Sequence, residues 1–281
     1  MEKAREVTLV RGLVRSARQE GKLIGLVPTM GALHEGHLSL VRLARESCEF
    51  VVVSIFVNLL QFSPDEDFQR YPRRPEKDAA LCEQAGVDLL YTPDAREFYP
   101  RDFSTGVVVA DVSDGGEGAM RPGHFQGVAT VVAKLFLQVS PDLAVFGRKD
   151  LQQVAVVRRL IRDLDFPIQI AVGETVRDPD GLALSSRNTY LSSEDRRLAA
   201  SFPKALETTR ASAQRGERDP GSLERIARRL LEENGFAVDY VEVVDSNTMR
   251  RPPRIEPGSA LSAAIRLGKT RLIDNVLLLE P

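Results

Sequence analysis

From Lys22 to about Val172 the chain alternates short, continuously apolar runs with segments in which apolar residues recur every three or four positions. This alternation is typical of right-handed βαβ units on a parallel sheet. Because the runs are apolar throughout, both faces of the sheet should be covered by helices. The predicted strands are Leu23–Val27, Phe50–Val57, Asp88–Tyr91, Val107–Ala110, Leu143–Phe146 and Ile168–Val172, and the predicted helices are Leu38–Cys48, Glu76–Ala85, Phe125–Val139 and Leu151–Leu164.

After Val172 the pattern changes to two charged helical stretches followed by three short strands. The second helix has a complete set of end signals, with Asp219 as N-cap, Pro220 at its first position and Gly235 just past its end. The expected fold class is therefore α/β, a Rossmann-like parallel sheet with helices on both faces, plus a smaller C-terminal α+β domain. We expect domains at residues 1–175 and 176–281. The late elements are Ser193–Gly216, Pro220–Glu233, Val238–Val244, Ala260–Arg266 and Arg271–Leu279.

Charge and composition exclude several kinds of protein. The 281 residues carry 38 Lys plus Arg against 40 Asp plus Glu, a formal charge of -2, so no basic field is present to capture nucleic acid. The longest mostly apolar stretch, Phe50–Leu60, is too short to span a membrane, and we expect no secretory signal. Cys48 and Cys82 form no framework, so we expect a cytoplasmic chain with two core cysteines, a disulfide between them being a minor alternative.

All three histidines lie in glycine-rich turns, which is unusual for residues that only fill a core. His34 and His37 belong to the segment Met30–His37, which follows the first predicted strand and opens a helix. Open α/β sheets bind ligands at the carboxyl ends of their strands, and the N–H groups of a helix start attract phosphate. The segment therefore predicts a phosphate site. A solvated turn with two surface histidines is the plainer alternative.

Two other interpretations of this turn are weaker. A His-x-x-His spacing could bind zinc, but no cysteine or acidic cluster stands nearby to complete a tetrahedral set. The glycines could suggest a dinucleotide site, but the three-glycine spacing G-x-G-x-x-G is missing.

Further polar clusters follow other strands. Arg148, Lys149 and Asp150 stand between a predicted strand and a helix, where two cations suit a phosphate, although a capped helix start with solvated cations gives the same pattern. Gln152 and Gln153 lie in the first turn of that helix, so a long amide could face the ligand. This edge of the sheet is the one at which the histidines are expected.

Two more segments offer polar groups to a ligand. Ser185–Arg187 lies near the expected domain junction, where loops often close over ligands, although such tripeptides are usually turns. Asn58 and Gln61 follow the second strand and could recognise hydroxyls or a carboxylate without adding charge.

The order and spacing of these segments are specific. They comprise Pro28–His37, Ser54–Asn58, Gln61-Phe62, Tyr71–Arg73, Arg121–Phe125, Phe146-Gly147, Lys149-Asp150, Gln152-Gln153, Gly181–Ala183, Ser185–Asn188 and Thr270–Asn275. Together they closely resemble the pantothenate synthetase (pantoate–β-alanine ligase) family of the nucleotidyltransferase superfamily, from about Leu26 to the C-terminus.

The resemblance implies a ligation in two steps. ATP and pantoate would give pantoyl adenylate and pyrophosphate, and β-alanine would then displace AMP to give pantothenate. Mg²⁺ would accompany ATP, the smaller domain would close over the ATP site, and the chain would form a homodimer.

The resemblance also implies the roles of individual residues. His34, His37 and Lys149 would be catalytic, with His37 as proton donor and Lys149 on a phosphate. Gln61 and Gln153 would hold pantoate, with Asn58 nearby. The ATP site would comprise Met30, Gly31, Ala32, Leu33, His34, Glu35, Gly36, His37, Gly147, Arg148, Lys149, Asp150, Val176, Leu184, Ser185, Ser186 and Arg187.

The sequence departs from the family pattern at five positions without removing a side chain named as catalytic. Leu59 replaces the usual proline, Leu184 the usual methionine, Gln126 the common arginine and Arg148 the usual Glu or Gln. Lys77 stands before Asp78 where an acidic residue is frequent, so the metal ligands stay undetermined.

Two other functions remain as alternatives. A nucleotidyltransferase that acts on a phosphorylated substrate would share the histidine turn and the serine-containing loop, but it would form no amide. An RNA-binding module is disfavoured by the net charge and by the absence of a basic, aromatic surface.

Overall fold

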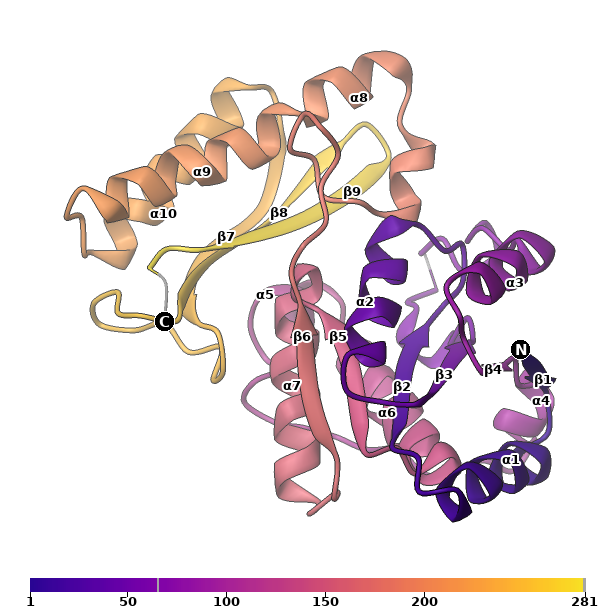
Figure 1. The fold of residues 1–281 in the computed structure, drawn as a ribbon. Helices are drawn as coiled ribbons and strands as arrows, with labels where there is room; N and C mark the ends of the chain where they lie inside the picture. The colour runs from indigo at the N-terminus through magenta and orange to yellow at the C-terminus, as the bar shows by residue number, and fades with distance from the viewer. Residues whose placement is uncertain (65, 280–281) are drawn as a thin grey trace. The chain divides into compact units, whose positions relative to one another are not determined.

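Six parallel strands form one sheet, in the order β1-β4-β3-β2-β5-β6 (Figure 1). The computed structural model describes residues 1–64 and 66–279. Within β2, Gly25 pairs with Val51 of β3 on one side and with Leu143 of β5 on the other. The parallel α/β class predicted from the sequence is confirmed. The strands are β1 (Glu2–Ala4), β2 (Ile24–Thr29), β3 (Phe50–Ile55), β4 (Leu89–Tyr91), β5 (Leu143–Gly147) and β6 (Gln169–Gly173).

Helices cover both faces of this sheet (Figure 1). Leu90 packs in a buried cluster with Val41 of α2 and Cys82 of α3. The neighbouring Tyr91 donates its hydroxyl to Gln138 Oε1 of α6 at 2.9 Å. Since adjacent residues of a strand point to opposite faces, α6 lies on the face away from α2 and α3. The helices are α1 (Val7–Gln19), α2 (Glu35–Arg45), α3 (Pro75–Gln84), α4 (Ala95–Phe98), α6 (His124–Val139) and α7 (Leu151–Asp163).

The two cysteines are buried free thiols on the α2 and α3 face, as expected of core residues. Burial raises the pKa of the Cys82 thiol to about 11. A neutral, enclosed thiol packs as a small apolar side chain.

The sequence predictions fail at two places in this sheet. The strand predicted at Val107–Ala110 is wrong: Val107 N–H donates to Thr130 Oγ1 of α6 at 3.0 Å, and Val108 is 69% exposed. The segment therefore runs along a helix without joining the sheet. Conversely, β1 escaped prediction because only Ala4 of its three residues is buried.

A second sheet is antiparallel, in the order β7-β8-β9, and comprises β7 (Ala237–Asp245), β8 (Ser259–Leu267) and β9 (Thr270–Leu277). Its apolar residues share one core with buried residues of α8 (Ser193–Ala199), α9 (Ser201–Gln214) and α10 (Pro220–Glu233). The predicted N-cap is confirmed, because Asp219 accepts from the backbone of Gly221 and Ser222. This is the smaller α+β part expected from the sequence.

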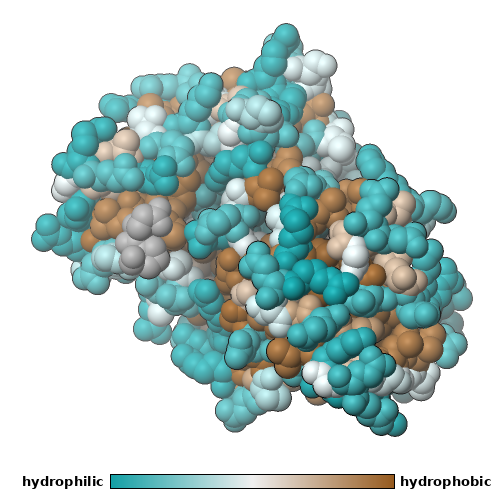
Figure 2. Space-filling view, viewed as in Figure 1, coloured by the Kyte–Doolittle hydropathy of each residue, from teal (hydrophilic) through white to brown (hydrophobic). Residues whose placement is uncertain are grey.

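The chain forms two compact units, each built from three separate stretches of the sequence. The first unit contains 1–109, 123–148 and 157–174, and the second contains 110–122, 149–156 and the chain from 175 onward. The chain passes for the last time from the first unit to the second between Glu174 and Thr175, one residue before the boundary predicted at 175/176. The short helix α5 (Gly116–Met120) also belongs to the second unit. Polar and charged side chains cover most of the face drawn in Figure 2. Within 1–64 and 66–279, no helix has both the length and the apolar character needed to cross a membrane.

Candidate active site

The strand order of the first unit reverses at one point. From β2 the chain adds β3 and then β4 on one side, whereas β5 and β6 lie on the other. Open α/β sheets bind ligands at the carboxyl ends of the strands at such a reversal. The carboxyl end of β2 leads directly into Met30–His37, and β5 ends at Gly147 with Arg148 directly after it.

The turn after β2 has a backbone that few residues adopt. Gly31 has φ +82° and Ala32 has φ 52°, both in the left-handed region. A Cβ at Gly31 would lie 2.9 Å from Ile55 Cγ2 and 3.0 Å from Asp78 Oδ2. Glycine is therefore required here both for its conformation and for the close approach.

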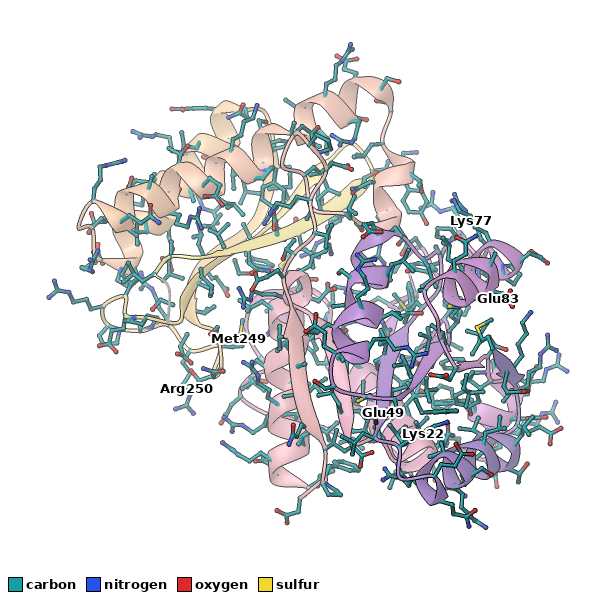
Figure 3. All side chains as sticks on the ribbon, in the orientation of Figure 1. Lys22, Glu49, Lys77, Glu83, Met249 and Arg250 are labelled. Atoms are coloured by element: carbon teal, nitrogen blue, oxygen red, sulfur yellow. The ribbon has the colours of Figure 1, made fainter. Side chains whose placement is uncertain are left out.

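Asp78 of α3 fixes this turn. Its carboxylate is buried and accepts from Ala32 N–H and Leu33 N–H, each at 2.8 Å. Lys77, next to it, is exposed on the same helix (Figure 3). The Asp78 carboxylate thus holds the backbone of the turn after β2, and the unusual Lys77 leaves this contact intact.

His34 and His37 cap the start of α2 and face each other. His34 Nδ1 accepts from Gly36 N–H at 3.2 Å, and His37 Nδ1 accepts from His34 N–H at 3.3 Å. The ring centroids are 4.1 Å apart. A neutral imidazole whose Nδ1 accepts carries its hydrogen on Nε2. Both rings are therefore held as Nε2–H donors at a helix N-terminus, where an anion is favoured.

Gln61 lies beside this turn. It ends the short helix η1 (Leu59–Gln61), and its Nε2 is 3.3 Å from Met30 Sδ. Asn58 caps η1 and is 1% exposed. Leu59 is exposed, so the departure from proline changes no buried contact.

His124 differs from the other histidines. It opens α6, is buried, and its Nδ1 lies 2.8 Å from the carbonyl oxygen of Gln61. Its glycine-rich neighbours made a position in the core unexpected. This expectation is wrong, because the side chain is buried. The glycine belongs to the helix start, where Gly123 has φ +81°.

Gly147 ends β5, and Arg148 opens the short helix η2 (Arg148–Asp150). Arg148 pairs with Glu174 Oε2 at 2.7 Å. The following residues belong to the second unit: Lys149 Nζ lies 3.5 Å from Asp150 Oδ1, and the carbonyl of Lys149 accepts from Asn275 Nδ2 at 2.9 Å. β9 of the second sheet thus fixes the backbone of Lys149.

Gln152 and Gln153 take different positions. Gln152 is buried, donates to the carbonyls of Val112 and Gly115, and accepts from Glu117 N–H. It therefore anchors the segment around α5. Gln153 is only partly buried. Gln61 and Gln153 belong to different units. That both bind the same ligand stays a prediction.

The segment from Val176 to Arg187 forms a hairpin that is held by hydrogen bonds within it and to β9. Leu184 N–H donates to the carbonyl of Val176 at 2.9 Å, and Arg177 makes a double hydrogen bond to Asp274 at 2.6 and 2.9 Å. Ser185 Oγ then caps η3 (Ser186–Tyr190) by accepting from Arg187 N–H. Leu184 contributes this bond through its backbone, so its replacement of methionine leaves the bond in place.

Sequence reasoning missed the supporting residues. Asp78, Tyr99 and Gly127 carry no local motif that signals a role, because their partners are distant in sequence. Asn275 lay in a recognised segment, but only the sheet pairing brings it to Lys149.

Comparisons with known proteins agree with one another. Residues 2–277 match the family described as Pantoate-beta-alanine ligase. The chain is 50% identical over 276 residues to the pantothenate synthetase of Sphingopyxis alaskensis, covering 98% of this chain and 99% of that protein. The crystal structure of pantothenate synthetase from Thermus thermophilus has a TM-score of 0.93 at 45% identity, covering 99% of this chain and 100% of that one.

A third relative was crystallised with ligands. The pantoate-beta-alanine ligase from Francisella tularensis, described as complexed with beta-gamma ATP and beta-alanine, has a TM-score of 0.83 at 33% identity, with coverage of 99% and 98%. On these matches over nearly its whole length, the chain belongs to the pantoate–β-alanine ligase family.

Proposed function

We propose that this chain joins (R)-pantoate to β-alanine at the expense of ATP, giving pantothenate, AMP and pyrophosphate through a pantoyl adenylate, in pantothenate and coenzyme A biosynthesis. Family membership supports the overall reaction, and the Francisella relative is complexed with beta-gamma ATP and beta-alanine. The observation that carries the assignment is the turn after β2, where two Nε2–H donors at a helix start lie on the segment that contacts Gln61.

In the first step a carboxylate oxygen of pantoate attacks the α-phosphorus of ATP. An O–P bond forms, the bond from the α-phosphorus to the bridging oxygen breaks, and pyrophosphate leaves with the electron pair. Negative charge accumulates on the leaving group, where donors aimed at it are most effective. We assign this role to His34, His37 and Lys149, assisted by Arg187.

In the second step the β-alanine nitrogen attacks the acyl carbon. The bond from this carbon to the AMP oxygen breaks, and the nitrogen loses a proton as the amide forms. No side chain becomes covalently attached. Because water would compete for the adenylate, we propose that the strip Leu184–Arg187 closes on the nucleotide.

Mg²⁺ is proposed to arrive bound to ATP. Within 1–64 and 66–279, no group of three or more His, Cys, Asp or Glu side chains could hold a metal ion. Sites that use Mg–ATP commonly supply one or two carboxylates and leave the rest to phosphate oxygens and water. Asp150, 47% exposed beside Lys149, suits that limited role. The bound ion would neutralise phosphate charge.

The remaining nucleotide contacts are proposed from the family pattern. Met30–Leu33, Glu35 and Gly36 would line the phosphates with Gly147, Arg148, Asp150, Ser185 and Ser186, and Val176 would lie near adenine through its backbone. Gln61 and Gln153 would bind pantoate. A homodimer and a cytoplasmic location belong to the same proposal.

The order of the two steps is tested without β-alanine. The purified protein should exchange labelled pyrophosphate into ATP only when pantoate and Mg²⁺ are both present, because the adenylate forms before the amine arrives. Equal exchange without pantoate, or none at saturating pantoate, would contradict the proposal.

Loss of a phosphate donor should slow adenylation. His37→Ala and Lys149→Ala should each reduce the single-turnover rate by ~100-fold or more, because the lost bonds strengthen as pyrophosphate leaves. Lys22→Ala is the matched control, since Lys22 precedes β2, at the end of that strand away from the turn that carries His37 (Figure 3). Its ammonium pairs with Glu20. A near-normal rate in either test variant would remove that residue from the catalytic set.

The pantoate assignment is tested by separate titrations. Gln61→Ala and Gln153→Ala should weaken pantoate use and slow adenylation while the KM for ATP changes little, because only pantoate loses a partner. Gln84→Ala, an exposed amide at the end of α3, is the control. A main loss in ATP binding would show that these amides do not hold pantoate.

A further inference from the structure

Asn58 uses its whole side chain inside the protein. Its Oδ1 accepts from Leu60 N–H at 3.3 Å and lies 2.9 Å from Tyr99 Oη. Its Nδ2 donates to the carbonyl of Gly127 at 3.1 Å and to Gln61 Oε1 at 2.9 Å. A carboxamide has two donor hydrogens and accepts two bonds, so this set is complete. With 1% exposure, Asn58 has no remaining group for a substrate, so the prediction that its amide contacts the substrate is wrong.

Backbone groups fix which end of Asn58 is oxygen. Leu60 N–H can only donate, and the Gly127 carbonyl can only accept. The oxygen must therefore face Leu60 and the nitrogen must face Gly127. Since Tyr99 meets the oxygen, its hydroxyl is the donor in that bond.

The same logic fixes Gln61. Because Asn58 presents an N–H to it, Gln61 must turn its Oε1 toward Asn58. The NH₂ of Gln61 is then the end directed at Met30, where it meets the Sδ atom at 3.3 Å. Thioether sulfur is a weak acceptor, so an oxygen of a ligand would be the better partner.

The backbone of Gln61 is held as firmly as its side chain. The carbonyl of Gln61 accepts from His124 Nδ1 at 2.8 Å. A Cβ at Gly127 would lie 2.3 Å from the carbonyl oxygen of Leu60 and 2.6 Å from Gln61 N. Helix α6 therefore lies directly against η1, with no space for any other residue at 127.

We propose that Tyr99 is a positioning residue that acts through Asn58 to hold the Gln61 carboxamide with its NH₂ toward pantoate. This inference rests on the proposed function. It also defines the chemistry recognised there: Gln61 selects an oxygen that accepts a hydrogen bond, such as a hydroxyl or carboxylate oxygen, and disfavours a donor group at that position.

The surroundings of Tyr99 suit this role. Its ring packs against Phe56, Phe98 and Phe103, with centroids 4.9 to 5.8 Å away, and Lys134 Nζ lies over the ring at 5.6 Å. Burial raises the pKa of the Tyr99 hydroxyl, so it keeps its proton at neutral pH. Removing only the hydroxyl leaves this packing in place.

The test is Tyr99→Phe, with pantoate and ATP titrated separately and pantoate affinity measured directly by calorimetry. We expect pantoate KM and dissociation constant to rise by ~5- to 10-fold, the usual effect of losing one buried hydrogen bond, while the KM for ATP stays unchanged. Tyr91→Phe is the matched control, because that hydroxyl also donates to a buried amide, Gln138, on α6. It should leave pantoate binding unchanged.

A double-mutant cycle shows whether Tyr99 acts through Gln61. In the Gln61→Ala background, Tyr99→Phe should change pantoate affinity by less than ~2-fold, because the carboxamide that Tyr99 positions is absent. A silent Tyr99→Phe, or an equal loss in both backgrounds, overturns the positioning role while the proposed function stands. A Gln61→Ala variant with normal pantoate binding overturns both the inference and the proposed role of Gln61.

Discussion

The turn after β2 depends on two hydrogen bonds that the backbone N–H groups of Ala32 and Leu33 donate to the Asp78 carboxylate. A buried carboxylate needs such donors, and the left-handed turn needs an acceptor for N–H groups that no strand or helix satisfies. The carboxylate and the two N–H groups therefore satisfy each other's hydrogen-bonding requirement. The turn then places His34 at the helix start, where the capping bonds turn both imidazole rings so that Nε2–H is the donating end.

The same principle recurs at Gln61, where backbone groups determine the direction of a neutral side chain. Leu60 and Gly127 orient Asn58, and Asn58 orients Gln61. A neutral amide can bind a carboxylate without the strong ground-state attraction of a fixed cation, which would hinder its attack on phosphorus. The proposed binding of pantoate by Gln61 would thus combine recognition with reactivity, because hydrogen bonds within the first unit fix the orientation of this amide.

Local patterns predicted the elements whose signals are local. The continuous apolar run at Leu143–Phe146 and the Asp219–Pro220 start of α10 both lie where expected. Val107–Ala110 has the composition of a strand, but its backbone bonds to a helix side chain. The motifs also indicated His34, His37 and Gln61, whereas the partners that orient Gln61 become visible only when α6 and Tyr99 meet η1 in space.

The central claim is that the pantoate carboxylate attacks the α-phosphorus and leaves one of its oxygens on AMP. Pantoate labelled with ¹⁸O in its carboxylate, turned over with ATP and β-alanine, tests this directly by mass spectrometry of the products. The account predicts one labelled oxygen in AMP and none in pyrophosphate. Label in inorganic phosphate, with ADP as the nucleotide product, or unlabelled AMP would contradict it.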